Sequence, residues 1–150
     1  MTLSLTVGTN TYISLADAET YMEKVYDPDG LWAAATDATK NNLLAQATID
    51  IDSEHWRYAK TDDDQTLEFP RAGETTIETK VANACVEQAL YRLRIGSEAT
   101  ARADLQAQGV TSFRLGDLSE TYGGGGGSVE LCGRVRRLMA EWWIAGAALA

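Results

Sequence analysis

Residues 76–96 most constrain the fold, because apolar side chains recur there at helical spacing over a broad face. The stripe and its flanking positions are Val81, Cys85, Ala89 and Leu93 with Ala82, Ala84, Val86 and Leu90. Side chains four residues apart lie on one side of an α-helix, and a helix apolar over so wide a face is enclosed by other elements. We therefore expect a central helix of a bundle, beginning near Thr76–Glu78 and ending at Gly96.

Two further helices are predicted upstream of this segment. Ser14 is a good N-cap for a short helix, which ends at the turn formed by residues 27–30. The next helix has Thr36 or Asp37 as its cap and runs to about His55. Its predicted buried face consists of Leu44, Ala47, Thr48, Ile51 and His55, and its predicted solvent face of Lys40, Gln46, Asp50 and Glu54.

Other segments predict extended structure, loops and tethers. Residues 2–12 alternate weakly and suggest an extended N-terminal arm. Residues 57–77 form a loop too long for a simple connector, with a short strand at 65–69. Residues 97–108 suit a short helix, and 110–122 an extended piece or hairpin.

The domain organisation follows from a glycine tract near the C-terminus. Residues 1–122 form a helical body with an extended arm, residues 123–127 are five glycines that predict a flexible linker, and residues 128–150 form a final helix. Its predicted apolar stripe consists of Leu131, Val135, Leu138, Met139 and Trp142. The expected fold class is mainly α: a small helical bundle with a long loop or short β-hairpin insertions and a tethered C-terminal helix.

The charge of the chain limits its partners. It carries 13 Lys and Arg against 22 Asp and Glu, a net charge of −9. Tight, general nucleic-acid binding draws mainly on cations that displace counterions from phosphate, so free DNA is not expected as a high-affinity ligand. An acidic surface would instead repel DNA and let it pass. Residues 128–150 have a net positive charge, which indicates either a separate partner or a helix with a solvated basic face.

The sequence offers no nucleophile–base pair and no metal cluster. His55 is the single histidine, and Cys85 and Cys132 lie in apolar helical patterns, so neither a Cys–His pair nor a zinc site is expected. Calcium-binding loops place their ligands at alternate positions and contain a turn glycine. Asp62–Asp64 are adjacent and no glycine follows them, so we expect a solvated acidic loop tip instead. The glycine tract lacks the Gly-Lys-Ser/Thr ending of a phosphate loop. We expect neither an enzyme nor a cofactor.

The N-terminus and the cysteine content indicate the compartment. The first residues lack the basic start and apolar run of a signal peptide, and no stretch is long enough to span a bilayer. Two cysteines do not make a disulfide framework in a chain of this size. We therefore expect synthesis in the cytoplasm and no membrane partner.

Aromatic and basic residues alternate in the long loop. The set consists of Trp56, Tyr58 and Phe69 with Arg57, Lys60 and Arg71. Aromatic rings that stack bases beside cations that hold phosphates are typical of single-stranded nucleic-acid binding. The alternative is that Trp56 and Phe69 fill the core where the loop packs onto the helices, with Arg71 paired to a neighbouring carboxylate. The acidic residues in the same loop favour this second interpretation.

Two adjacent tryptophans, Trp142 and Trp143, end the apolar stripe of the last helix. Neighbouring helical positions lie about 100° apart, so one of the two rings is expected to leave the intramolecular core. An exposed tryptophan beside arginine is typical of a protein–protein anchor. This segment is therefore the strongest local indication of partner binding.

One set of residues, spread over most of the chain, forms a recognisable pattern. It consists of Tyr12, Ser14, Ala18, Tyr21 and Trp32, the run Leu44–Asp52 with Ala47, Thr48, Ile51 and Asp52, then Trp56, Gln65, Leu67, Phe69, Pro70 and Arg71, the segment Val81–Leu90, and Gly116, Asp117, Ser119 and Tyr122. With this pattern the chain resembles a family of tailed-phage head–tail connector proteins, also called adaptors or head-completion proteins. The family often has Gly-x-Arg after the tryptophan, whereas Arg57-Tyr58-Ala59-Lys60 follows Trp56 here.

The resemblance implies a structural virion protein at the head–tail interface. Such adaptors form rings of usually twelve subunits between the portal and a tail or stopper protein, and they line the channel through which genomic DNA passes without tight binding. Under this interpretation Gln65, Leu67, Phe69 and Arg71 would reach neighbouring subunits. The portal-docking residues would be Arg134, Arg136, Arg137, Trp142 and Trp143. Some relatives carry a primosome-like label for single-stranded DNA binding, which supplies the alternative function.

Overall fold

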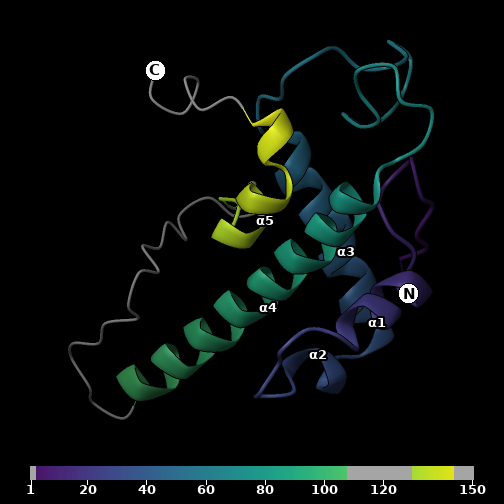
Figure 1. Cartoon of the computed structure of the whole chain (residues 1–150). Coiled ribbons are helices and arrows are strands. Elements are labelled where there is room, and N and C mark those ends of the chain that lie inside the picture. Colours follow the sequence, from purple (N-terminus) through teal and green to yellow (C-terminus); the bar gives the residue numbers. More distant parts are fainter. Residues whose placement is uncertain (1–2, 108–129, 144–150) are drawn as a thin grey trace.

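The computed structural model describes residues 3–107 and 130–143, and the chain is mainly helical, as predicted. Its elements are α1 (Leu15–Met22), α2 (Leu31–Ala34), α3 (Asp37–Asp52), α4 (Thr79–Ala107), α5 (Gly133–Leu138) and the 3₁₀ turn η1 (Ala140–Trp142) (Figure 1). Within these residues the backbone forms isolated β-bridges and no strand. None of the described helices has the length and apolar character needed to cross a membrane.

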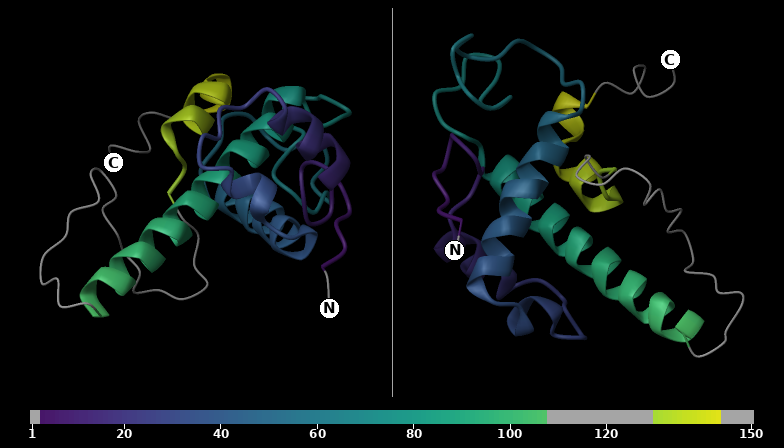
Figure 2. Two further views of the ribbon diagram at one scale, coloured as in Figure 1. Left: turned by 90° about the horizontal axis from the view of Figure 1, so that it is seen from below. Right: turned by 180° about the vertical axis from the view of Figure 1, so that it is seen from behind.

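The two long helices α3 and α4 form the centre of the molecule. The shorter helices flank them: α1 and α5 lie on opposite sides of the α3–α4 pair (Figure 1, Figure 2). The lower half of α4 extends beyond the body in these views. The long loop between α3 and α4 lies at the end of the molecule away from this protruding half of α4 (Figure 1).

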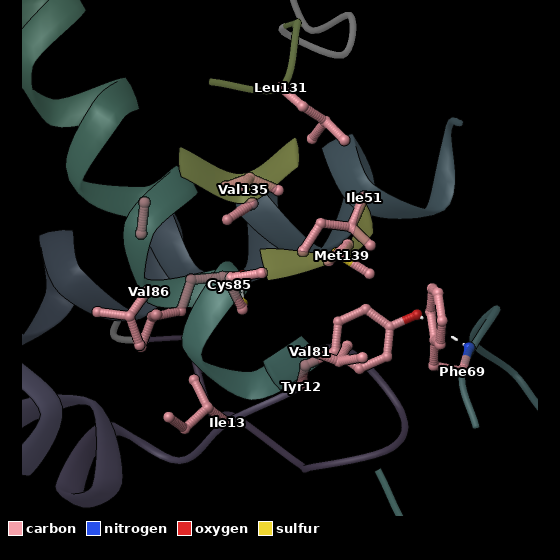
Figure 3. Close-up of a cluster of buried hydrophobic side chains, with 14 of the residues drawn as sticks. Tyr12, Ile13, Ile51, Phe69, Val81, Cys85, Val86, Leu131, Val135 and Met139 are labelled. Carbon is pink, nitrogen blue, oxygen red and sulfur yellow. Dashed lines mark hydrogen bonds between the residues drawn. The ribbon is translucent and has the colours of Figure 1, made fainter. Parts of the chain in front are cut away.

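The core confirms the apolar face predicted for the central helix. Val81, Cys85 and Ala89 are fully buried, and Leu93 is partly buried. Figure 3 shows side chains from the N-terminal arm, α3, α4 and the α5 segment converging on this face. The centre of the bundle is therefore built from all parts of the described chain.

The predicted end of the central helix is wrong. The helix continues through Gly96 to Ala107, so the short helix predicted from 97 is the second half of α4. A glycine inside a helix costs only about 1 kcal/mol. Its neighbours include Arg94 and Ala99, which are good helix formers and outweigh that cost.

Both predicted N-caps are present. The Ser14 hydroxyl accepts the N–H of Asp17 at 3.1 Å, and the Thr36 hydroxyl accepts the N–H of Thr39 at 3.2 Å. Thr36, rather than Asp37, is therefore the cap of α3.

The face and the end of α3 need correction. The helix stops at Asp52, and His55 lies exposed beyond it. Lys40 and Asp50, predicted to point to solvent, are buried. Each has an ionic partner from another helix: Lys40 pairs with Glu19 of α1 at 2.6 Å, and Asp50 pairs with Arg92 of α4 at 2.6 Å. Periodicity alone carries no information about such partners.

The strand predicted at residues 65–69 does not form. The N–H groups of Glu68 and Phe69 bond to side chains instead, at 3.4 Å to Asp52 and 3.2 Å to the Tyr12 hydroxyl. A single antiparallel bridge joins Lys60 to Arg71. Side-chain acceptors therefore take the place of a strand partner.

The C-terminal helix is shorter than predicted. It begins at Gly133, after the N-cap Cys132, and gives way to η1. Leu131, Val135, Met139 and Trp142 of the predicted stripe are buried. The segments predicted at 110–122 and 123–127 lie outside the described residues, as do residues 128–129 and 144–150 of the predicted final helix.

Candidate nucleic-acid interface

Arg71 connects the start of the long loop to the turn near its middle. Its guanidinium donates to the carbonyl oxygens of Trp56 at 3.3 Å, Arg57 at 2.9 Å and Tyr58, and to the carbonyl and carboxylate of Glu68, both at 3.1 Å. The Arg71 side chain is 8% exposed. Because guanidinium donors form a rigid fork, Arg71 fixes the backbone at 56–58 relative to the turn at 68–71. The predicted pairing of Arg71 with a carboxylate is confirmed.

Tyr12 and Asp52 hold the loop from the other side. The Tyr12 hydroxyl donates to the Asp52 carboxylate and accepts the Phe69 N–H (Figure 3). Burial raises the pKa of Asp52 to about 6, while the hydrogen bond from Tyr12 acts in the opposite direction. Burial also raises the pKa of the Tyr12 hydroxyl. The N-terminal arm and α3 therefore anchor the loop through a shared polar contact.

An aromatic cluster joins the loop to the C-terminal segment. Phe69 packs edge-to-face against Trp56 and Trp142, with ring centroids 5.3 Å apart in each pair, and against Tyr12 at 6.0 Å. Trp56 packs in the same way against Trp143 at 5.6 Å. Trp56 and Phe69 are 5% and 2% exposed, so the prediction that they fill the core is confirmed. Their rings are not available to stack bases.

The cluster brings an exposed part of the loop beside α5. The Arg57 N–H donates to the carbonyl of Trp142 at 2.8 Å, and Trp56 forms an antiparallel bridge with Trp143. Arg57 is exposed, and Tyr58 is 60% exposed with a positive φ of 68°. The Arg136 guanidinium lies 5.5 Å from the centroid of the half-buried Trp143 ring. We name Arg57, Tyr58, Arg136 and Trp143 the loop–α5 patch.

The cations around this patch differ in their pairing. Arg136 forms an exposed pair with Glu130. Arg57 and Arg137 form no ion pair with any residue of 3–107 and 130–143. Exposed ion pairs contribute roughly 0–1 kcal/mol, so a phosphate can displace Glu130 from Arg136. The patch therefore offers arginine to an anion.

Arg134 has a different environment from the other arginines of α5. It donates to the buried Glu87 carboxylate at 2.9 Å, and Tyr21 donates to the same carboxylate at 2.6 Å. The Glu87 carboxylate raises the pKa of Arg134. Burial, followed by the bond to Glu87, raises the pKa of Tyr21 to about 12. Arg134 therefore links α5 to α4 and α1.

The residues predicted for portal docking divide into two groups. Arg136 and Arg137 are exposed and Trp143 is half-buried, whereas Trp142 is 4% exposed. Trp143 is partly buried and packs against the core through the Trp56 ring, so the prediction that one of the two adjacent tryptophans leaves the core is met only in part.

The loop residues predicted to contact neighbouring subunits anchor their own loop. Leu67, Phe69 and Arg71 are buried, and the Gln65 amide donates to the carbonyls of Leu67 and Pro70 at 2.8 and 2.9 Å.

The other candidates for chemistry are not members of the patch. His55 is exposed, while Cys85 is buried between α3 and α4, where burial raises its thiol pKa to about 11. Asp62–Asp64 are exposed at the loop tip, as predicted. Within the described parts of the chain, no cluster of three or more His, Cys, Asp or Glu could hold a metal ion.

The sequence did not indicate that Arg57 and Tyr58 lie beside α5. The two segments are far apart in the chain, and their contact depends on the edge-to-face packing of Trp56 on Trp143. The signal available was the presence of a tryptophan in both segments.

Comparison with known proteins identifies a family but no individual relative. Neither the curated proteins nor the solved structures contain a significant match to the chain. A family model described as "Putative DnaT-like ssDNA binding protein" matches residues 2–148. That match includes the long loop, α4 and α5, and the chain belongs to this DnaT-like family.

Proposed function

We propose that the protein binds single-stranded nucleic acid at the loop–α5 patch. The observation that carries the proposal is the exposed Tyr58 ring beside Arg57, an arginine without an ion pair among the described residues. A base stacked on an aromatic side chain contributes about 1–3 kcal/mol, and neighbouring cations hold the phosphates. The family description supports the same ligand class.

The charge of the molecule limits the strength of this binding. The net charge is −9, and several cations outside the patch are already paired with carboxylates: Lys40, Lys60, Lys80 and Arg92. A strand that leaves the patch therefore meets an acidic surface that repels it. We expect a short binding site and an affinity that falls as salt is added.

The test is fluorescence anisotropy with a labelled oligothymidylate at low salt. We compare the wild type with Tyr58→Asn, because asparagine tolerates the positive φ at this position. The variant should bind about tenfold more weakly, the lower part of the range for a lost stacking contact. The matched control is Tyr26→Asn, which removes a tyrosine that is 82% exposed and lies outside the patch. Equal affinities of Tyr58→Asn and wild type would contradict the proposal.

A second candidate function is that of a head–tail connector subunit. It is favoured by the exposed Arg136, which lies over the half-buried Trp143, and by the exposed Arg137, on a molecule that is otherwise acidic. These residues would dock on a portal, and the acidic remainder would face passing DNA. Because Leu67, Phe69 and Arg71 are buried in their own subunit, contacts between subunits would use other parts of the loop.

Native mass spectrometry with and without portal protein tests the second candidate. Deleting 128–150 would also remove the buried Val135 and Trp142, so charge reversal of the exposed Arg136 and Arg137 is the sharper change. The connector account expects wild type to join the portal and the charge-reversed variant to stay free. Unchanged attachment of that variant would exclude α5 as the docking element.

A further inference from the structure

Glu130 occupies one of the two arginines of the loop–α5 patch. Its carboxylate accepts from the Arg136 guanidinium, and the two side chains are 69% and 43% exposed. A carboxylate and a phosphate present the same kind of acceptor to a guanidinium, a pair of anionic oxygens. Glu130 therefore fills, from within the chain, the position at Arg136 that a phosphate of a bound strand would take.

The backbone on both sides of this ion pair is fixed. The Glu130 carbonyl accepts from the Gln88 side chain at 3.1 Å, and the N–H of Cys132 donates to the same side chain at 3.0 Å. Gln88 is fully buried in α4. In the first turn of α5, the Arg136 N–H donates to the Cys132 carbonyl at 3.1 Å. The two charged side chains therefore meet at a high effective concentration, which favours the internal carboxylate over a free anion.

The position of Arg136 does not depend on Glu130 alone. Its guanidinium lies 5.5 Å from the centroid of the Trp143 ring, which packs edge-to-face on Trp56 at 5.6 Å. A guanidinium stacked over an aromatic ring still presents the N–H groups at its edge to an anion. A phosphate can therefore replace the carboxylate if the Glu130 side chain turns away while Arg136 keeps its place over the ring.

Glu130 is the acid that competes for this patch. Among residues 3–107 and 130–143, no other ion pair includes a residue of the patch, and Arg57 forms none. We infer that Glu130 is an internal competitor of the nucleic acid, so that a strand engages Arg136 only by displacing it. This inference rests on the proposed function and adds a means by which the chain limits its own affinity.

Removing the competitor should strengthen binding. An exposed ion pair changes an equilibrium by at most about fivefold, so Glu130→Gln should bind oligothymidylate about two- to fivefold more tightly than wild type at low salt. The control, Glu141→Gln, removes the same charge from an exposed pair with Lys80 and should give a smaller gain. In an Arg136→Gln background, Glu130→Gln should give no more than this control does. Equal gains from the two glutamate variants, or a full gain without Arg136, would overturn the inference.

A second measurement uses no nucleic acid. Inorganic pyrophosphate is titrated while the NMR signal of the Arg136 Nε–H group is followed, and thermal unfolding checks that the variants remain folded. The midpoint should lie at an about two- to fivefold lower concentration in Glu130→Gln than in wild type, whereas Glu141→Gln should follow wild type. Identical titrations of Glu130→Gln and wild type would overturn this inference alone. Equal oligothymidylate affinities of Tyr58→Asn and wild type would instead overturn the proposed function.

Discussion

Arg71 donates to carbonyl groups at the start of the long loop and at Glu68, and the position of the Tyr58 backbone depends on this contact. Its guanidinium reaches the carbonyls of Trp56, Arg57 and Tyr58 while pairing with Glu68. Removing a buried donor leaves its acceptors without partners, which costs more than the hydrogen bond contributes.

Arg71→Ala should lower the free energy of unfolding by about 3 kcal/mol, because one buried and three partly buried carbonyls lose their donor. Arg71→Lys should lower it by about 1–2 kcal/mol, since lysine keeps the charge but lacks the planar fork. Urea denaturation measures both. Arg57→Ala serves as the control, because Arg57 is exposed and its loss should change stability by less than about 0.5 kcal/mol. Equal effects at positions 57 and 71 would contradict this role for Arg71.

Asp52 should make the stability depend on pH. Burial raises its pKa to about 6 from an ordinary 3.8, so the folded state binds a proton that the unfolded state has already lost. The penalty for the charged form is fully present above about pH 6 and disappears as pH falls toward 3.8. The gain should be on the order of 1 kcal/mol, after allowance for partial exposure.

The measurement compares wild type with Asp52→Asn in urea at several pH values. Asparagine can still accept the Tyr12 hydroxyl but does not titrate. The difference between the two unfolding free energies should therefore shift in favour of wild type as pH falls from 7 to about 4.5. Parallel profiles would show that Asp52 does not titrate in this range.

Individual residues were predictable from the sequence where burial followed the apolar pattern. The burial of Val81, Cys85 and Ala89 followed from their spacing. The burial of Lys40 and Asp50 could not be predicted from the apolar pattern, because it depends on their ionic partners Glu19 and Arg92 from other helices. The positions of Arg57 and Tyr58 beside α5 depended on a contact between distant aromatic rings.

At the scale of elements, a polar connection fixes α3 against α4 and α5. The fully buried Asp50 carboxylate accepts from Arg92 at 2.6 and 2.7 Å and from Gln88 at 3.0 Å. Gln88 also donates to the carbonyl of Glu130 at 3.1 Å and accepts the N–H of Cys132 at 3.0 Å. One α4 side chain thus positions both α3 and the start of α5.

Asp50→Ala should lower the free energy of unfolding by about 3–5 kcal/mol, because Arg92 would keep its charge without its carboxylate partner. The matched control is Glu141→Ala, which breaks the exposed pair with Lys80 on the same helix and should cost less than about 1 kcal/mol. Chemical denaturation measures both. Equal losses would show that the buried pair does not hold the helices together.

The helices themselves were easier to predict than their ends. The caps Ser14 and Thr36 are local signals and were found, because a hydroxyl bonds to the backbone three residues on. The end of α4 was not predicted correctly, because Gly96 is tolerated within a long helix. The missing strand at 65–69 reflects acceptors from Tyr12 and Asp52, which lie far away in the sequence.

At the scale of the whole molecule, the acidic charge and the loop–α5 patch would have opposite effects on the proposed ligand. A net charge of −9 repels nucleic acid, while Arg57 and Arg136 would attract it locally. Binding to a single strand releases counterions, so the affinity falls as salt is added. The logarithm of the binding constant falls with the logarithm of the salt concentration, with a slope of about −0.7 for each phosphate neutralised. The number of cations that take part can therefore be counted.

Oligothymidylate affinity measured against salt should give a slope of about −1.4 to −2.1, as expected for two or three phosphate contacts. Arg57→Ala should reduce the magnitude of that slope by about 0.7, whereas Lys24→Ala, which removes an exposed cation just after α1, should leave it unchanged. Anisotropy titrations at several salt concentrations provide the measurement. A slope unaffected by Arg57→Ala would place the nucleic acid elsewhere.

The most direct test of the proposed function is photochemical cross-linking of an oligothymidylate to the wild-type protein, followed by peptide mass spectrometry. We predict that the cross-linked peptides contain Tyr58 or Trp143, the aromatic residues of the loop–α5 patch. Cross-links confined to Tyr26 or other exposed sites, or no cross-link at low salt, would contradict the account.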